Sequence, residues 1–74
     1  MIKKEYKKEI MNIINHAKHG EIYESSVPAK VWRQYLMENR IQYNTEVFIM
    51  LPHLGTMYII KHNGIQFHVI AWIK

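Results

Sequence analysis

An Asn-Gly pair near the C-terminal end of the chain constrains the fold more than any other feature of the sequence. Asn63-Gly64 separates two runs rich in β-branched and aromatic residues, 56–62 (TMYIIKH) and 65–73 (IQFHVIAWI). A type I′ turn needs positive φ at both central residues, which Asn-Gly tolerates well, so the segment predicts a β-hairpin. A two-residue loop then pairs His62 with Ile65, Ile60 with Phe67 and Tyr58 with Val69.

The segments before the hairpin predict one more strand and two helices. Residues 46–51 (EVFIML) are typical of a short strand that Pro52 ends, with a tight loop over 52–55. Apolar residues at helical spacing predict amphipathic helices over 2–18, with Gly20 as its C-cap, and over 27–40, with Ser26 as its N-cap. Residues 21–26 are expected to be a connection that can include a short extended piece, and residues 41–45 a turn or linker. We therefore expect one α+β domain over residues 1–74, in the order α-α-β-β-β, with a three-stranded antiparallel meander.

The predicted pairing divides the sheet into two faces. A four-residue loop at 52–55 places Val47 opposite Ile60 and Ile49 opposite Tyr58, and opposed residues share a face. The first face, called the core face below, is expected to carry both helices. It consists of Val47, Ile49, Leu51, Tyr58, Ile60, Ile65, Phe67, Val69, Ala71 and Ile73.

The second face, called the outer face below, is too apolar for a surface that meets only water. It consists of Phe48, Met50, Met57, Ile59, His68, Ile70 and Trp72, with Lys61 and Gln66 toward the hairpin tip. In a meander with one solvent-exposed face, apolar and polar residues alternate along each strand. Soluble monomers rarely expose a contiguous apolar patch of this size. Three explanations stay open: one helix covers each face, the face pairs with its copy in a homodimer, or it docks another protein. The predicted partner is thus a protein or a second copy.

Composition limits the remaining classes. The chain has no cysteine, which excludes disulfides and thiolate sites. No run approaches the ~20 apolar residues of a membrane span, and the N-terminal lysines are not followed by the apolar core of a signal peptide. We expect a cytoplasmic protein without a membrane partner. Its size and its Ile-, Lys- and Asn-rich composition suit a phage-type modulator, for example an inhibitor, of a host protein.

Motifs for catalysis or metal binding are absent from the sequence. There is no cysteine, no aspartate, no G-x-S-x-G and no phosphate loop. Glu5 and Glu9 are interpreted as solvated ion-pair partners on a lysine-rich face, and Ser25-Ser26 as capping residues. His16 and His19 lie on adjacent helical turns, but no third ligand has a diagnostic spacing. We expect no enzyme activity, no cofactor, no metal and no small-molecule substrate.

Positive charge supports an alternative, a nucleic-acid-binding regulator. The net charge is +4 and the isoelectric point about 9.5. A helix followed by a hairpin is the geometry of a winged helix, in which residues 20–26 would have to supply the third helix. The residues expected to contact nucleic acid are Lys30, Arg33, Arg40, Lys61 and His62.

A more distant alternative comes from a resemblance. Two helices followed by a three-stranded meander that ends in VIAWI (69–73) is loosely similar to the ribosome-dependent ribonuclease toxins of toxin–antitoxin pairs. That family has an additional strand before its helices. The resemblance is one of topology and implies no specific residue here. The leading hypothesis remains a small non-enzymatic regulatory protein that binds through the outer face.

Overall fold

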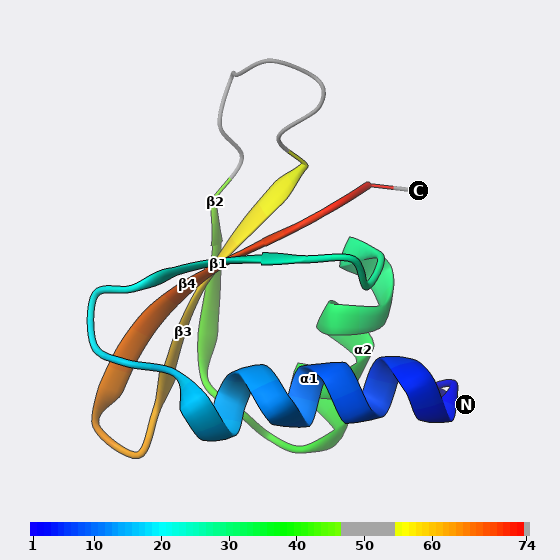
Figure 1. Cartoon of the computed structure of the whole chain (residues 1–74), viewed down its shortest axis with the longest axis horizontal. Helices are drawn as coiled ribbons and strands as arrows, with labels where there is room; N and C mark the ends of the chain where they lie inside the picture. The colour runs from blue at the N-terminus through cyan, green and yellow to red at the C-terminus, as the bar shows by residue number, and fades with distance from the viewer. Residues whose placement is uncertain (47–54, 74) are drawn as a thin grey trace.

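A computed structural model describes residues 1–46 and 55–73 of the chain. Within these residues the elements are two helices and four strands: α1 (Lys4–His16), β1 (Ile22–Ser25), α2 (Ala29–Glu38), β2 (Tyr43–Glu46), β3 (Thr56–His62) and β4 (Ile65–Ala71). The strands form one mixed sheet in the order β1-β4-β3-β2 (Figure 1). The α+β class is therefore confirmed, whereas the predicted three-stranded antiparallel meander is wrong.

The strand missing from the prediction is β1. It pairs in parallel with β4, with Tyr23 opposite Val69 and Ser25 opposite Ala71. The Tyr23 and Phe67 rings also meet edge to face, with centroids 6.2 Å apart. A four-residue run has too little alternation to predict a strand by itself, and its partner lies near the other end of the chain. Pairing with β4 decides its conformation.

The hairpin of β3 and β4 has the predicted turn and register. Asn63 and Gly64 have φ of 52° and 77°, as a type I′ turn requires. His62 lies opposite Ile65, and the pairing continues down to Thr56 opposite Ala71. A local backbone requirement thus determined this part of the sheet.

The register predicted for the preceding strand is wrong. Tyr43 pairs with Ile60 and Thr45 with Tyr58, the positions expected for Val47 and Ile49. The shift of four residues is even, so odd-numbered residues still lie on the core face. The error came from assuming a four-residue loop at 52–55. Of the predicted strand only Glu46 lies in β2, and residues 47–51 lie outside the described residues.

The helices are shorter than predicted, and their ends differ. The backbone leaves α1 at an extended Ala17, where the Tyr23 hydroxyl accepts a hydrogen bond from the Lys18 amide (3.0 Å). Gly20 is therefore not the C-cap. Pro28 precedes α2, and no side chain caps this helix. The predicted capping role of Ser26 is wrong, because its hydroxyl bonds to Glu9 instead (2.8 Å).

Both helices pack on the core face, as Figure 1 shows. This excludes the explanation in which each face carries one helix. The core is formed by residues of both helices, of the two central strands β3 and β4, and of the connections. They are Ile10, Ala17, Val27, Ala29, Trp32, Tyr35, Leu36, Tyr58, Ile60, Phe67, Val69 and Ala71. Ile65 and Ile73, expected on the core face, are 37% and 70% exposed because they lie at its two ends.

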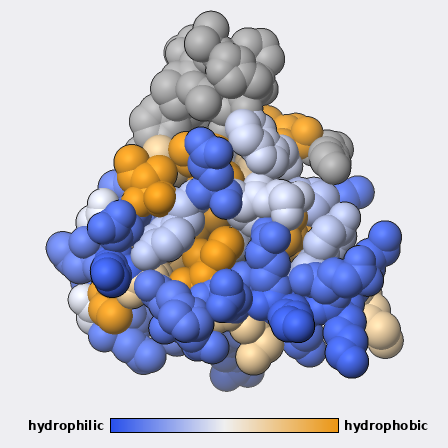
Figure 2. Space-filling model, in the orientation of Figure 1, coloured by the Kyte–Doolittle hydropathy of each residue, from blue (hydrophilic) through white to orange (hydrophobic). Residues whose placement is uncertain are grey.

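The surface seen from the side of α1 is mainly hydrophilic, and hydrophobic residues show only in patches (Figure 2). Within the described parts of the chain, neither helix has the length and apolar character needed to cross a membrane.

Candidate functional site

The outer face of the sheet is the first candidate site. In its centre Met57 lies opposite Ile70 and Ile59 lies opposite His68, all of them half-buried. The edge strand β1 adds Ile22 beside His68, with 59% of its surface exposed. Since α1 and α2 both lie on the core face, neither covers these side chains.

Polar and charged residues surround this apolar centre. Lys61 and Gln66 are opposed next to the hairpin tip, and both are exposed. Glu24 lies beside Ile70 on β1, and Asn44 lies beside Ile59 on β2. An apolar centre inside a polar rim is the usual arrangement of a protein interface.

The structure describes five of the seven residues predicted for this face. Trp72 follows Ala71 directly after β4 and is half-buried, and its carbonyl accepts a hydrogen bond from the Ala29 amide (2.7 Å). Phe48 and Met50 lie outside the described residues. Alternation along the strands assigned Met57, Ile59, His68 and Ile70 to this face, as the register has them. It missed Ile22, because β1 was not predicted as a strand.

The residues predicted to contact nucleic acid do not form one surface. Lys30 and Arg33 are exposed near the start of α2, on the core-face side of the sheet, whereas Lys61 lies on the outer face. Arg40 follows α2 with φ of 55°, and His62 lies at the hairpin next to Asn63. The segment that would supply the third helix of a winged helix forms β1 instead. The extra strand thus lies between the helices, and not before them as in the ribonuclease toxins.

Lys30 and Arg33 do share a hollow of about 520 Å³ with residues of the sheet. Tyr43 and Thr45 of β2 and Thr56 of β3 also line it. Sequence reasoning missed these three hydroxyl side chains. Tyr43 and Thr45 were missed because only the true register of β2 brings them beside Thr56 and under the start of α2. This hollow is the second candidate site.

The tyrosine at the bottom of this hollow is Tyr58. Its hydroxyl donates a hydrogen bond to the Ala29 carbonyl (2.6 Å). Burial raises the pKa of Tyr58, as does neighbouring Tyr43, while the positive charge of Arg33 lowers it. The tyrosine therefore stays protonated and structural near neutral pH, and Arg33 is close enough to influence the hollow.

Glu9 has a different role from the one predicted. Its carboxylate accepts hydrogen bonds from the Ser25 hydroxyl (2.9 Å), the Ser26 amide (3.1 Å) and the Ser26 hydroxyl (2.8 Å). The interpretation of Glu9 as a solvated ion-pair partner is therefore wrong. The carboxylate fastens α1 to the connection between β1 and α2, which is a structural task.

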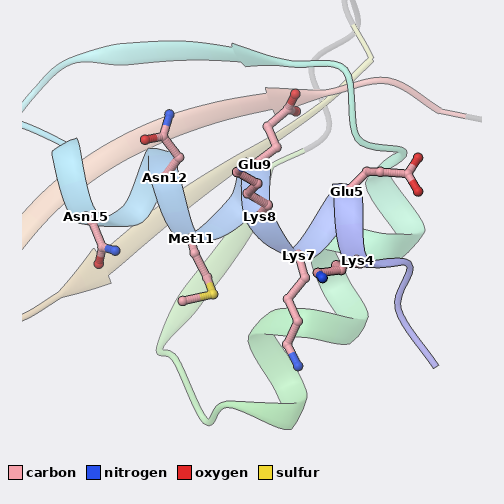
Figure 3. Close-up of a pocket in the computed structure, with 8 residues that line it drawn as sticks. All are labelled: Lys4, Glu5, Lys7, Lys8, Glu9, Met11, Asn12 and Asn15. Atoms are coloured by element: carbon pink, nitrogen blue, oxygen red, sulfur yellow. The ribbon is translucent and has the colours of Figure 1, made fainter.

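A larger hollow, about 1000 Å³, lies along the outside of α1. Figure 3 shows that its eight lining residues all belong to this one helix, and that Glu9 points toward β1 while Lys7 and Met11 point the opposite way. Side chains that diverge from a single helix do not converge on a ligand, so we assign no site there.

The histidine at the end of α1 and the one in the turn after it have separate partners. His16 Nδ1 lies 2.8 Å from the Asn12 carbonyl, and His19 Nδ1 accepts a long hydrogen bond from the Gln66 amide (3.4 Å). Among the described residues, no three histidine, cysteine or acidic side chains are grouped so that they could hold a metal ion.

Comparison of the chain with protein-family models, with curated proteins and with solved structures found no match.

Proposed function

We propose that this chain is a small, non-enzymatic regulatory protein that acts by protein–protein contact through the outer face of its sheet. The observation that carries the proposal is the placement of both helices on the core face. Neither helix therefore covers Met57, Ile59 and Ile70, which are half-buried on the opposite face. Burying these side chains against another chain removes apolar surface from water, which favours association.

A second copy of the chain is the occupant that the charges favour. Lys61 lies toward the hairpin end of the outer face, and Glu24 lies toward the opposite end. A two-fold axis in the interface that crosses the strands obliquely places Lys61 on β3 of one copy over Glu24 on β1 of the other. The apolar centres then meet, and opposite charges approach at both ends.

The size of the face sets the expected strength of the dimer. Four strands about 4.8 Å apart, of at most seven residues at about 3.3 Å each, cover roughly 400 Å². A stable interface of standard size buries about 800 Å² per partner. We therefore expect a dissociation constant weaker than about 1 μM, so the measurement needs high protein concentrations.

The test is analytical ultracentrifugation over a concentration series up to the millimolar range. We expect a shift from the 9.0 kDa chain to a dimer of twice that mass. The double variant Ile59→Thr/Ile70→Thr keeps β-branched residues in the strands but should weaken the dimer about tenfold or more, a loss of 1.4 kcal/mol or more. Met37→Gln is the matched control, because Met37 is 61% exposed on α2, away from this face.

Charge reversal tests the two-fold arrangement itself. Lys61→Glu should weaken the dimer, and adding Glu24→Lys should restore part of the affinity. A chain that stays monomeric at millimolar concentration contradicts self-association. A dimer insensitive to the double threonine variant contradicts the assignment to the outer face.

A further inference from the structure

The hollow beneath the start of α2 combines positive charge with hydroxyl groups. Lys30 and Arg33 contribute the charge, and the hydroxyl side chains of Tyr43, Thr45 and Thr56 line the same space. No acidic side chain is among its described lining residues. The electrostatic character of this space therefore favours an anion.

The sheet determines how the hydroxyl groups are grouped. Thr45 lies opposite Tyr58, and Thr56 precedes Tyr58 by two residues on β3. Thr45 and Thr56 therefore lie on the core face together with Tyr58. The Tyr43 ring meets the Tyr58 ring edge to face, with centroids 5.9 Å apart. Because Tyr58 is buried and its own hydroxyl is occupied, it serves as a rigid floor between the three groups.

Two hydrogen bonds hold α2 over this floor. The Ala29 carbonyl accepts from the Tyr58 hydroxyl, and the Ala29 amide donates to the Trp72 carbonyl. Lys30 follows Ala29 directly, and Arg33 lies three residues further, on the same side of the helix. These bonds fix the backbone at the start of α2, from which both cationic side chains extend, relative to β3 and the residue after β4.

Phosphate is the anion that this set of donors suits best. A guanidinium group donates two parallel hydrogen bonds to phosphate oxygens, and an ammonium group adds a point charge. Hydroxyl groups supply the remaining donors. The volume of about 520 Å³ exceeds what one inorganic phosphate fills and lies within the range of about 300–1,000 Å³ for small-molecule sites.

We propose that this hollow binds the phosphate group of a small molecule about the size of a mononucleotide. Arg33 and Lys30 hold the phosphate, Thr45 and Thr56 donate hydrogen bonds to its oxygens, and the half-buried Tyr43 contacts the rest of the molecule. The site is on the core-face side of the sheet. It does not depend on the proposed dimer, and both sites are accessible at once.

The test is a titration followed by ¹H–¹⁵N NMR, with AMP, adenosine, inorganic phosphate and a twelve-nucleotide oligothymidylate as probes. We expect AMP to shift the amide signals of Thr45 and Thr56, and adenosine to leave them unchanged. Arg33→Gln and Lys30→Gln should each weaken AMP binding about tenfold, the usual size of a lost charge-assisted contact. Thr45→Val, which removes a hydroxyl and keeps the β-branched shape, should weaken it about threefold.

Lys7→Gln is the control, because it removes the same charge from the outside of α1, away from this hollow. It should change AMP affinity less than twofold, and the urea midpoint of each variant verifies that the chain remains folded. Equal effects of Lys7→Gln and Arg33→Gln would show diffuse attraction and overturn the proposal. So would equal binding of adenosine and AMP.

The oligothymidylate distinguishes the source of the phosphate. Oligothymidylate that binds more tightly than AMP, and loses affinity in Arg33→Gln, would assign the donors to nucleic acid and overturn the small-molecule ligand. AMP binding that is retained while oligothymidylate shows no shifts in these amides supports the proposal.

Discussion

The hydroxyl of Ser25 is the most informative single group to remove. Ser25 is 1% exposed, and its oxygen makes three hydrogen bonds. It accepts from Trp32 Nε1 (2.7 Å) and from the Val27 amide (3.1 Å), and it donates to Glu9 (2.9 Å). One atom therefore joins α1, the end of β1 and the middle of α2.

The expected cost of Ser25→Ala follows from these contacts. The substitution leaves the Trp32 and Val27 donors buried without an acceptor, and each costs about 1–3 kcal/mol. Glu9 keeps its two bonds to Ser26. We expect a loss of about 2–6 kcal/mol in the free energy of unfolding. A chain of 74 residues has roughly 4–11 kcal/mol in total, so this is a large fraction of it.

Ser26→Ala is the matched control. Ser26 is exposed, and its hydroxyl makes one bond, to Glu9. Its removal should cost about 0.5–1 kcal/mol. Urea unfolding, followed by tryptophan fluorescence and by circular dichroism, measures both variants. With a slope near 1 kcal/mol per M, the midpoints should differ by about 1 M or more.

Similar midpoints for the two variants would refute the reasoning. That result would mean that the buried donors find other partners, and that the Ser25 hydroxyl does not connect the elements. A changed slope would point instead to a change in the folded or unfolded ensemble, and the free energies would not be comparable.

Three further substitutions test the packing and the turns. Ile60→Ala removes a fully buried side chain, so thermal unfolding should show a loss of about 2–5 kcal/mol. Gly55→Ala places a Cβ atom 2.9 Å from the Trp72 Cα, at a residue with φ of 64°. It should lower the free energy of unfolding more than Gly20→Ala, because Gly20 has φ of 80° but open space around it. The urea midpoints of the two variants test this order. Tyr58 and Tyr35 have pKa values raised by burial above the ordinary 10.0, so unfolded chains lose these protons first and stability should fall as pH rises above about 10. Tyr58→Phe should flatten that alkaline decline while lowering stability at pH 7, and an unchanged decline would argue against the assignment.

The two candidate sites use opposite sides of one sheet. The outer face offers an apolar centre with separated charges, and the hollow under α2 offers cations and hydroxyl groups. Together, the two proposals describe a chain that combines self-association with the binding of a small ligand. The NMR titration and the ultracentrifugation address these properties independently.

Local features of the sequence predicted part of this structure well. Asn63-Gly64 determined the turn and register of β3 and β4, because the backbone requirement lies within four residues. Alternation then assigned Tyr58 and Phe67 to the core face, and helical periodicity predicted both helices. These predictions needed no knowledge of the distant parts of the chain.

The centre of the outer face was also predictable, because the turn fixes the pairing of β3 with β4. Met57 and Ile59 were assigned to it by the hairpin register alone. Ile22 was not, because nothing within residues 21–26 specifies a strand. The neighbour of this segment is β4, which follows some forty residues later in the chain.

Tertiary structure alone decided the rest. The parallel pairing of β1 with β4, the register of β2 and the bonds between Glu9, Ser25 and Trp32 all join separate elements of the fold. The hollow under α2 follows from them, because β2 must pair at Tyr43 before its hydroxyl groups lie beside Arg33. The order of residues alone predicted the hairpin, the two helices and the apolar centre of the outer face, because turn dihedrals and periodicity act over a few residues. Contacts between distant segments depend on how the whole chain packs, and only the folded structure decides them.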